Sequence, residues 1–487
     1  MSLERLKGTQ DLLGSAHASH RAIQEALQAF LASYGYEAID TPILELTELY
    51  LRKSGGELTS RLYAFTDQGG HQISLRPEFT ASVIRAYLQD REKSPLPLRW
   101  QYSGPVFRYE PLQDSQYRQF TQLGAELLGA GGPRADAEII SLACKGLQEV
   151  GISSSRLVIG HAGPFLHLLE GLGLSGRVKA FLIGSLGQIS RGDESLESLR
   201  ERGRKLNLFG EVGEKGYLED LVGELGEEEA RAVIQGLLRG EGNEVTGGRD
   251  PEEIVSRFIR KMRGGDDPAK VERGLLLTSK LSQTRGQPSK ALSGAKEVLK
   301  ELDFDLAALE SLERVLDLLK DNDLGDVDVS LDFGLARDIA YYTGMVFEIY
   351  HHSAMGELRL CGGGRYDGLV KALGAKEDTP ALGFAYGVEL MQQALEGLKQ
   401  SPASNIASNI AALVVPTSAK AYTQALRVAD EMRKGGQRVE MEVCDFTIEE
   451  SILYAKRKGI ATVRMVDEKG FIAEHEVEGH VKARSTQ

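Results

Sequence analysis

The sequence has few cysteines, no excess of positive charge and no long hydrophobic run. Its three cysteines, Cys144, Cys361 and Cys444, form no CxxC pair or metal-site spacing, so we expect free thiols in a reducing compartment. Asp and Glu outnumber Lys and Arg by 71 to 58, and the net charge of -13 argues against broad contact with a polyanion. No stretch approaches the roughly 18 apolar residues of a membrane span, and the N-terminus lacks a signal-peptide core. We therefore expect a soluble cytoplasmic protein.

A chain of 487 residues with 41% hydrophobic content allows two to four domains with sizeable cores. Ile23, Leu27 and Leu31 recur at helical spacing, which predicts a helix that ends near Gly35. The patterns that follow predict strands at 36–41, 71–75 and 98–102, a hairpin of 106–109 with 118–123, and further strands at 327–333, 345–350 and 358–361. Residues 175–310 show charge, glycine and short helical patterns without strand alternation, which predicts a helical insertion.

The last part of the chain alternates between strand and helix patterns. Residues 399–410 read as a polar linker, and residues 411–487 as a separate α/β domain. We predict strands at 412–415, 439–443 and 461–466, with one helix capped by Ser418 and another by the capping box Thr447 and Glu450. A βαβαβ order of this kind predicts a small, largely parallel sheet.

Six sequence blocks occur in an order that is typical of one family. They are GTQDLL, YGYEAIDTPILE, LRPEFTA, FRYE with YRQFTQLGAELLG, ARDIAYYTGMVFE, and GGGRYDGL with GFAYGVEL. The chain resembles the histidyl-tRNA synthetases, class II enzymes whose α+β fold is an antiparallel sheet flanked by helices. The resemblance implies a synthetase-like core at 1–174 and 311–398, an anticodon-binding-like domain at 411–487, and a homodimer. A paralogue shares this fold, namely the regulatory subunit of the short-form ATP phosphoribosyltransferase.

A free histidine needs a carboxylate for its ammonium, a guanidinium for its carboxylate and an acceptor or phenol for its imidazole. The resemblance implies that such a pocket consists of Glu78, Thr80, Gln122, Glu126, Arg337, Tyr341, Tyr342 and Tyr366. In this assignment Arg337 meets the carboxylate, and Glu126 and Tyr342 recognise the imidazole. Gln122 and Glu126 are four residues apart, so they share a face of a helix or of a strand. The alternative is that these polar groups are scattered structural hydrogen bonders.

The same resemblance implies two arginines that hold a bent triphosphate, and here only Arg108 is kept. Leu390 stands where the family pattern ends in arginine, and the loop Pro111–Gln116 lacks two arginines and adds Asp114. A charge-assisted contact to phosphate contributes about 1.5–3 kcal/mol, so three losses would remove several powers of ten in rate. We interpret Arg108, Gln116 and Leu390 as a vestigial ATP site. Sequence drift compensated by other basic residues is the alternative.

Three more departures point the same way. Phe79 stands where the synthetases have glycine and would crowd or reshape the pocket entrance, and Asp338 and Ala340 alter the block that contains Arg337. The last domain has 12 Lys and Arg against 12 Asp and Glu, so it has no net attraction for tRNA. The run Gly362 to Gly364 lacks P-loop spacing, and we expect close backbone approach beside a pocket instead.

These features favour a non-catalytic regulatory subunit of ATP phosphoribosyltransferase that binds histidine for feedback control of histidine biosynthesis. We expect no cofactor, no metal and no membrane. The expected partners are histidine and a short catalytic subunit, with a homodimer inside a hetero-oligomer, and tRNA is disfavoured as a partner but left open. The alternative is an active histidyl-tRNA synthetase with ATP, Mg²⁺ and tRNA as partners. A tRNA-binding sensor without catalysis is a third possibility.

Overall fold

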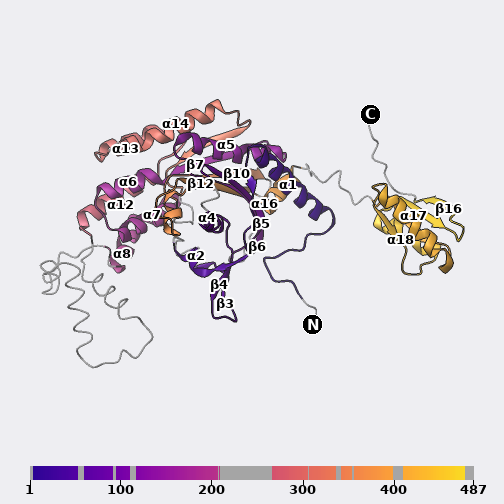
Figure 1. The fold of residues 1–487 in the computed structure, drawn as a ribbon. Helices are drawn as coiled ribbons and strands as arrows, with labels where there is room; N and C mark the ends of the chain where they lie inside the picture. The colour runs from indigo at the N-terminus through magenta and orange to yellow at the C-terminus, as the bar shows by residue number, and fades with distance from the viewer. Residues whose placement is uncertain are drawn as a thin grey trace, which may run out of the picture. The chain divides into compact units, whose positions relative to one another are not determined.

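The computed structural model describes residues 4–52, 60–90, 95–109, 117–192, 194–206, 208, 266–304, 306–335, 342–353, 356–398 and 410–477. The chain divides into two compact units, one of residues 1–10 with 23–400 and one of residues 11–22 with 401–487. Figure 1 shows the elements of each unit. The loop at 111–116 and residues 336–341 lie outside the described part of the chain. The domain boundaries at 174, 310, 398 and 410 stay a prediction.

A nine-stranded sheet forms the centre of the larger unit, in the order β1-β5-β6-β12-β11-β10-β7-β9-β8. Its strands are β1 (Glu37–Ala38), β5 (Leu98–Phe107), β6 (Gln119–Leu128), β7 (Ser155–His161), β8 (Arg285–Gly286), β9 (Val327–Asp332), β10 (Met345–Ser353), β11 (Gly356–Arg365) and β12 (Ala381–Gly387). Only the pairs β1–β5 and β7–β9 are parallel. The predicted α+β class with an antiparallel sheet flanked by helices is confirmed.

Strand alternation decides which face of this sheet is covered. Leu123, Ala125 and Leu127 of β6 enter the main hydrophobic core, whereas Gln122, Gly124 and Glu126 point to the opposite face. The core side is packed by α1 (Gly14–Ser33), α5 (Pro133–Glu149) and α16 (Val388–Gly397). α5 lies on β10, β11 and β12, and α14 (Ala307–Asp321) packs on α5 (Figure 1). The opposite face, which we call the polar face, carries Gln122 and Glu126 together with two smaller apolar clusters.

Smaller elements surround the polar face. They are the sheet β2 (Leu44–Leu46), β4 (Gln72–Leu75) and β3 (Ala64–Thr66), and the helices α2 (Thr47–Leu51), α4 (Thr80–Gln89) and α15 (Asp367–Ala372). The described parts of 162–301 are helical apart from β8, with α6 (Ala162–Gly171), α7 (Gly176–Arg191), α8 (Leu196–Lys205), α12 (Pro268–Ser282) and α13 (Pro288–Glu301). Leu182 and Leu275 lie in a second apolar cluster that holds α7 against α12.

The smaller unit contains a four-stranded sheet in the order β14-β13-β15-β16. Its elements are β13 (Ala412–Pro416), the 3-10 turn η2 (Ala419–Ala421), α17 (Tyr422–Lys434), β14 (Val439–Met441), α18 (Ile448–Lys458), β15 (Thr462–Val466) and β16 (Ile472–Glu476). β13 pairs in parallel with β14 and β15, as predicted, and the Thr447–Glu450 capping box is present. Ser418 caps no helix; its hydroxyl donates to Glu468.

Three sequence predictions of local structure are wrong in detail. The segments at 98–102 and 106–109 form one strand, β5, because Pro105 lies beyond the short partner β1, where no neighbouring strand needs its N–H. The glycine run Gly362–Gly364 lies inside β11 rather than after it. The antiparallel strand β16 was not predicted. No helix in the described part of the chain is long and apolar enough to cross a membrane.

Candidate functional site

Glu126 lies at the centre of a polar pocket on the open face of the sheet. Its carboxylate is 1% exposed and accepts hydrogen bonds from Thr80 Oγ1 at 2.7 Å, from Tyr102 OH at 3.2 Å, and from Tyr366 OH. These donors come from the start of α4, from β5 and from the residue after β11. Burial raises the pKa of Glu126 to about 8, although the three donors act in the opposite direction.

Glycines on the neighbouring strands leave the space that this carboxylate occupies. A Cβ on Gly383 of β12 would lie 1.6 Å from Glu126 Oε2. A Cβ on Gly124 would lie 2.6 Å from Tyr102 OH, and one on Gly364 would lie 2.8 Å from the Tyr342 ring. Close backbone approach beside a pocket is thus the function of these glycines, as we expected for the run in β11.

A second buried carboxylate lies beside the first. Glu78 is 4% exposed, and its Oε1 accepts the backbone N–H of Ala81 at 3.0 Å at the start of α4. Its Oε2 accepts no hydrogen bond from the described residues. Burial raises the pKa of Glu78, and the Glu78 charge in turn raises that of Glu126. Two buried carboxylates are costly without a cation or N–H donors, so the pocket suits a ligand that supplies both.

Of the remaining predicted pocket residues, the structure describes Gln122 and Tyr342 but not Arg337 and Tyr341. Gln122 lies on the same face of β6 as Glu126, and its buried Oε1 accepts no hydrogen bond in the part of the chain that the structure describes. Tyr342 packs against the cluster that contains Tyr366. Arg337 and Tyr341 lie outside the described residues, as do Asp338 and Ala340. The structure therefore brings together Glu78, Thr80, Glu126 and Tyr366, with Gln122 on the same strand face.

Tyr102 belongs to this pocket and was missed in the sequence. Its ring stacks on Phe79 with centroids 4.3 Å apart and an interplanar angle of 9°. Phe79 is 1% exposed and lies under the Arg76 guanidinium. Its ring contacts the tyrosine that donates to Glu126, and its effect on the pocket entrance stays a prediction. The signal was available, because Tyr102 and Trp100 alternate with Gln101 along β5.

Arginines gather at the open end of the β5–β6 hairpin. Arg108 donates from Nε to Pro77 O at 2.9 Å and lies over the Phe120 ring. The N–H of Arg108 donates to Arg118 O, and the N–H of Tyr109 donates to Arg61 O. Leu390 packs against the main core, and its neighbour Glu389 accepts the Thr121 N–H. Gln116 lies outside the described residues.

The histidyl-tRNA synthetase family model matches residues 8–204 and 264–391, which is well over half of the chain. The chain belongs to this family. Both matched segments contribute to the Glu126 pocket, since β6 and α4 lie in the first and Tyr366 and Gly383 in the second.

Curated relatives within the family share nearly the whole chain. A protein of Methanocaldococcus jannaschii named histidine–tRNA ligase is 30% identical over 466 residues, covering 96% of this chain and 92% of its own length. A histidine–tRNA ligase of Pyrococcus furiosus is 29% identical over 467 residues, with 96% and 92% coverage. These relatives overturn the interpretation as a non-catalytic regulatory subunit and favour the alternative, an aminoacyl-tRNA ligase.

Solved structures show the same fold at lower identity. A protein of Bacillus halodurans, described as an ATP phosphoribosyltransferase regulatory subunit/histidyl-tRNA synthetase, has a TM-score of 0.63 at 21% identity, covering 96% of this chain and 99% of its own. The apo histidyl-tRNA synthetase of S. aureus has a TM-score of 0.57 at 22% identity, covering 98% of both chains. At these identities the structures support the class II synthetase-like fold alone.

The wrong inference came from counting missing arginines. The residues at Leu390 and in the loop Pro111–Gln116 were compared only with the arginines at the same positions of the family pattern. Compensation by other basic residues was kept only as the alternative, although Arg118 lies next to Arg108 and Tyr109 and the backbone of Arg61 is bonded to Tyr109. A triphosphate is held by the sum of several charges, so a site with other nearby cations tolerates the loss of individual contacts.

Proposed function

We propose that this chain is a histidine–tRNA ligase, which activates histidine with ATP and transfers it to tRNA. The observation that supports this most strongly is the similarity to curated histidine–tRNA ligases along almost the entire chain, both domains included. The core alone could serve another purpose, but a shared C-terminal unit and a shared core together favour the complete reaction.

Histidine would bind over Glu126 and Glu78. An imidazole N–H donates to the Glu126 carboxylate, whose position is set by Thr80, Tyr102 and Tyr366. The ammonium binds near Glu78 Oε2, which has no donor among the described residues. Each contact replaces the water that a buried carboxylate has lost, and this is why the pocket favours an amino acid with an N–H-bearing side chain. Gln122, Tyr342, Arg337 and Tyr341 complete the proposed set.

ATP would bind at the hairpin end, next to the histidine carboxylate. Arg108 is the family arginine that the chain retains, and it is close enough to Glu78 for its charge to counter the burial that raises the Glu78 pKa. Arg118, which directly precedes the facing strand β6, lies over Tyr109 with its guanidinium carbon 4.5 Å from the ring centroid. We propose that these two arginines take the phosphate contacts that Leu390 cannot make. No group of three or more His, Cys, Asp or Glu that could hold a metal ion occurs among the described residues.

The proposed partners follow from the reaction. They are histidine, ATP and tRNA, with a second copy of the chain as a homodimer. The catalytic subunit of a phosphoribosyltransferase, which the sequence analysis expected as partner, is not confirmed by any relative described above.

The test is histidine-dependent ATP–pyrophosphate exchange and tRNA charging by the purified full-length chain. We expect both activities, with Glu126→Gln raising the KM for histidine at least tenfold while the KM for ATP changes little. Arg118→Gln should raise the KM for ATP while the KM for histidine changes little. The matched control is Glu357→Gln, which removes an exposed carboxylate paired with Arg156 far along the sheet. Histidine binding without exchange or charging would refute the ligase proposal.

A further inference from the structure

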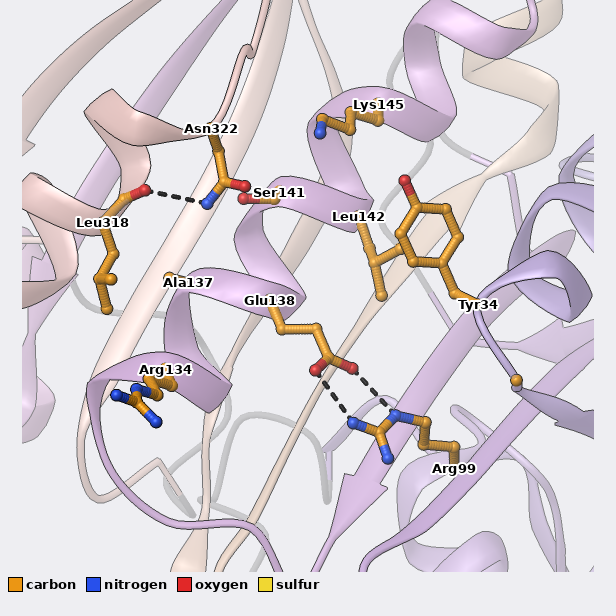
Figure 2. A pocket seen from close by; sticks show the side chains of 11 residues that line it. Tyr34, Arg99, Arg134, Ala137, Glu138, Ser141, Leu142, Lys145, Leu318 and Asn322 are labelled. Carbon is orange, nitrogen blue, oxygen red and sulfur yellow. Dashed lines mark hydrogen bonds and ion pairs between the residues drawn. The ribbon is translucent and has the colours of Figure 1, made fainter.

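A second pocket lies on the covered side of the sheet, away from Glu126. It has a volume of about 500 Å³ and lies between the end of α1, one face of α5 and the end of α14. Figure 2 shows the α5 side chains along its length, with Tyr34 and Arg99 on one side and Leu318 and Asn322 on the other. The volume is within the range of small-molecule sites, which is roughly 300–1,000 Å³.

The wall that α5 contributes is built by helical spacing. Arg134, Glu138, Ser141 and Lys145 recur every three or four residues and so share one face of the helix. The other face carries Ile139, Ile140, Ala143 and Leu147 into the main core. Since the core fixes the rotation of α5, the polar face must point away from the sheet and into this pocket.

The pocket carries an excess of positive charge on an acidic protein. Glu138 is already neutralised, because Arg99 donates to both of its carboxylate oxygens at 3.0 Å and Tyr36 OH donates to Oε1 at 3.0 Å. Arg134 and Lys145 form no hydrogen bond or ion pair with the rest of the described chain. Two cations thus remain without a counter-charge from the described residues, one near each end of the pocket (Figure 2).

The middle of the pocket holds a buried hydroxyl without a partner. Ser141 is 7% exposed, and its Oγ makes no hydrogen bond in the described structure. Figure 2 shows it facing Asn322, whose Nδ2 donates to Leu318 O at 2.9 Å and whose carbonyl oxygen remains as an acceptor. A buried hydroxyl left unpaired is unfavourable, and a hydrogen-bonding ligand would offset that cost. Leu142, Leu318 and Ala137 add apolar surface.

We propose that this pocket binds an elongated small molecule with an anionic group, phosphate or carboxylate, at each end of an uncharged, hydrogen-bonding body. Arg134 and Lys145 are eleven residues apart on one helix, which corresponds to an axial separation of about 16 Å. A compact anion therefore meets only one of them, whereas a dianion bridges both. The hydroxyl of Ser141 and the amide of Asn322 bind the body between its ends. The site does not depend on the proposed ligase function.

The experiment is calorimetric titration of the full-length chain, with histidine at saturation to separate this pocket from the Glu126 site. The probes are fructose 1,6-bisphosphate and N-succinyl-β-alanine, which carry phosphates and carboxylates respectively on hydrogen-bonding bodies, against inorganic phosphate and glucose 6-phosphate. We expect at least one of the two long dianions to bind about tenfold more tightly than the single-ended probes, since a second charged contact contributes that much. Which dianion binds identifies the anionic group.

Variants locate the binding. Arg134→Gln and Lys145→Gln should each weaken the dianion about tenfold. Ser141→Leu changes no charge and should abolish binding by filling the pocket. Lys320→Gln is the matched control, because Lys320 lies on α14, pairs with Asp317 and does not line the pocket. Circular dichroism checks that each variant is folded; if Ser141→Leu is not, the two charge variants decide.

Three results would overturn the proposal. The first is that neither dianion binds more tightly than inorganic phosphate. The second is that binding survives in Arg134→Gln combined with Lys145→Gln but is lost in Arg108→Gln, which would place the anion at the hairpin arginines. The third is that Ser141→Leu converts a dimer into a monomer by light scattering, which would assign this face to a second copy of the chain.

Discussion

Histidine binding should release a proton from Glu126, and this tests the pocket more directly than loss of activity. The carboxyl has a pKa of about 8 because it is fully buried, with the charge of Glu78 adding to the shift. At pH 7 it is therefore about nine-tenths protonated in the free protein. A ligand that donates an N–H to the carboxylate needs the ionised form, so binding lowers this pKa and expels the proton.

The magnitude follows from the pKa. Ionising a group with a pKa of about 8 costs about 1.4 kcal/mol at pH 7, because each unit between pKa and pH is worth about that much. If the bound carboxyl titrates below about pH 6, affinity for histidine should increase roughly eightfold from pH 7 to pH 8.5. The sign is set by the raised pKa, since a carboxyl that was already ionised at pH 7 would give no increase.

Calorimetry in two buffers with different ionisation enthalpies, HEPES and Tris, counts the protons released. We expect about 0.9 per site at pH 7 for the parent and close to none for Glu126→Gln, which cannot titrate there. Glu348→Gln is the matched control, because Glu348 is 4% exposed but lies in β10 and pairs with Arg359. Equal proton release by the parent and Glu126→Gln would refute the reasoning.

Three further predictions concern packing and stability. Gly383→Ala should abolish histidine binding, because its Cβ would lie 1.6 Å from Glu126 Oε2. Gly397→Ala is the control, since a Cβ there meets open space and histidine binding should be unchanged. Histidine titration of the two variants tests this. Arg365→Gln leaves Asp136 buried without its partner and should lower the free energy of unfolding in urea by about 3–5 kcal/mol. Arg52→Gln breaks the exposed pair with Glu48 and should lower it by less than about 1 kcal/mol. Equal losses in the two variants would contradict this. Thr447→Ala should cost the smaller unit about 1 kcal/mol, and Ser418→Ala almost nothing, as judged by the thermal transition of the full chain.

Local patterns in the sequence were sufficient for much of the fold. Ile23, Leu27 and Leu31 predicted α1, because a helix that packs on a sheet repeats its apolar residues every three or four positions. Thr447 and Glu450 predicted the start of α18, since a capping box is a contact within one turn. β16 was not predicted because all five of its residues are exposed, so its sequence shows no alternation of buried apolar and exposed polar side chains.

The sequence predicted several residues of the candidate site, but not the atoms that surround each of them or the burial of the carboxylates. The spacing of Gln122 and Glu126 placed both on one face, because side chains alternate along any strand. The roles of Tyr102 and Gly383 were not found, although Gly383 opens the block GFAYGVEL, since each residue matters only through the atom it lies next to.

The sequence by itself determined the family, the shared strand face of Gln122 and Glu126 and the capping box at Thr447, because these depend on motifs and on contacts within a few residues. Only the tertiary structure decided the chemistry of the pocket. Thr80, Tyr102 and Tyr366 reach Glu126 from positions up to 240 residues away in the chain, and the burial of Glu126 raises its pKa although these donors lower it. Electrostatic energy depends on the distance to every neighbouring charge and on access to water, so it is a property of the assembled fold and not of any segment.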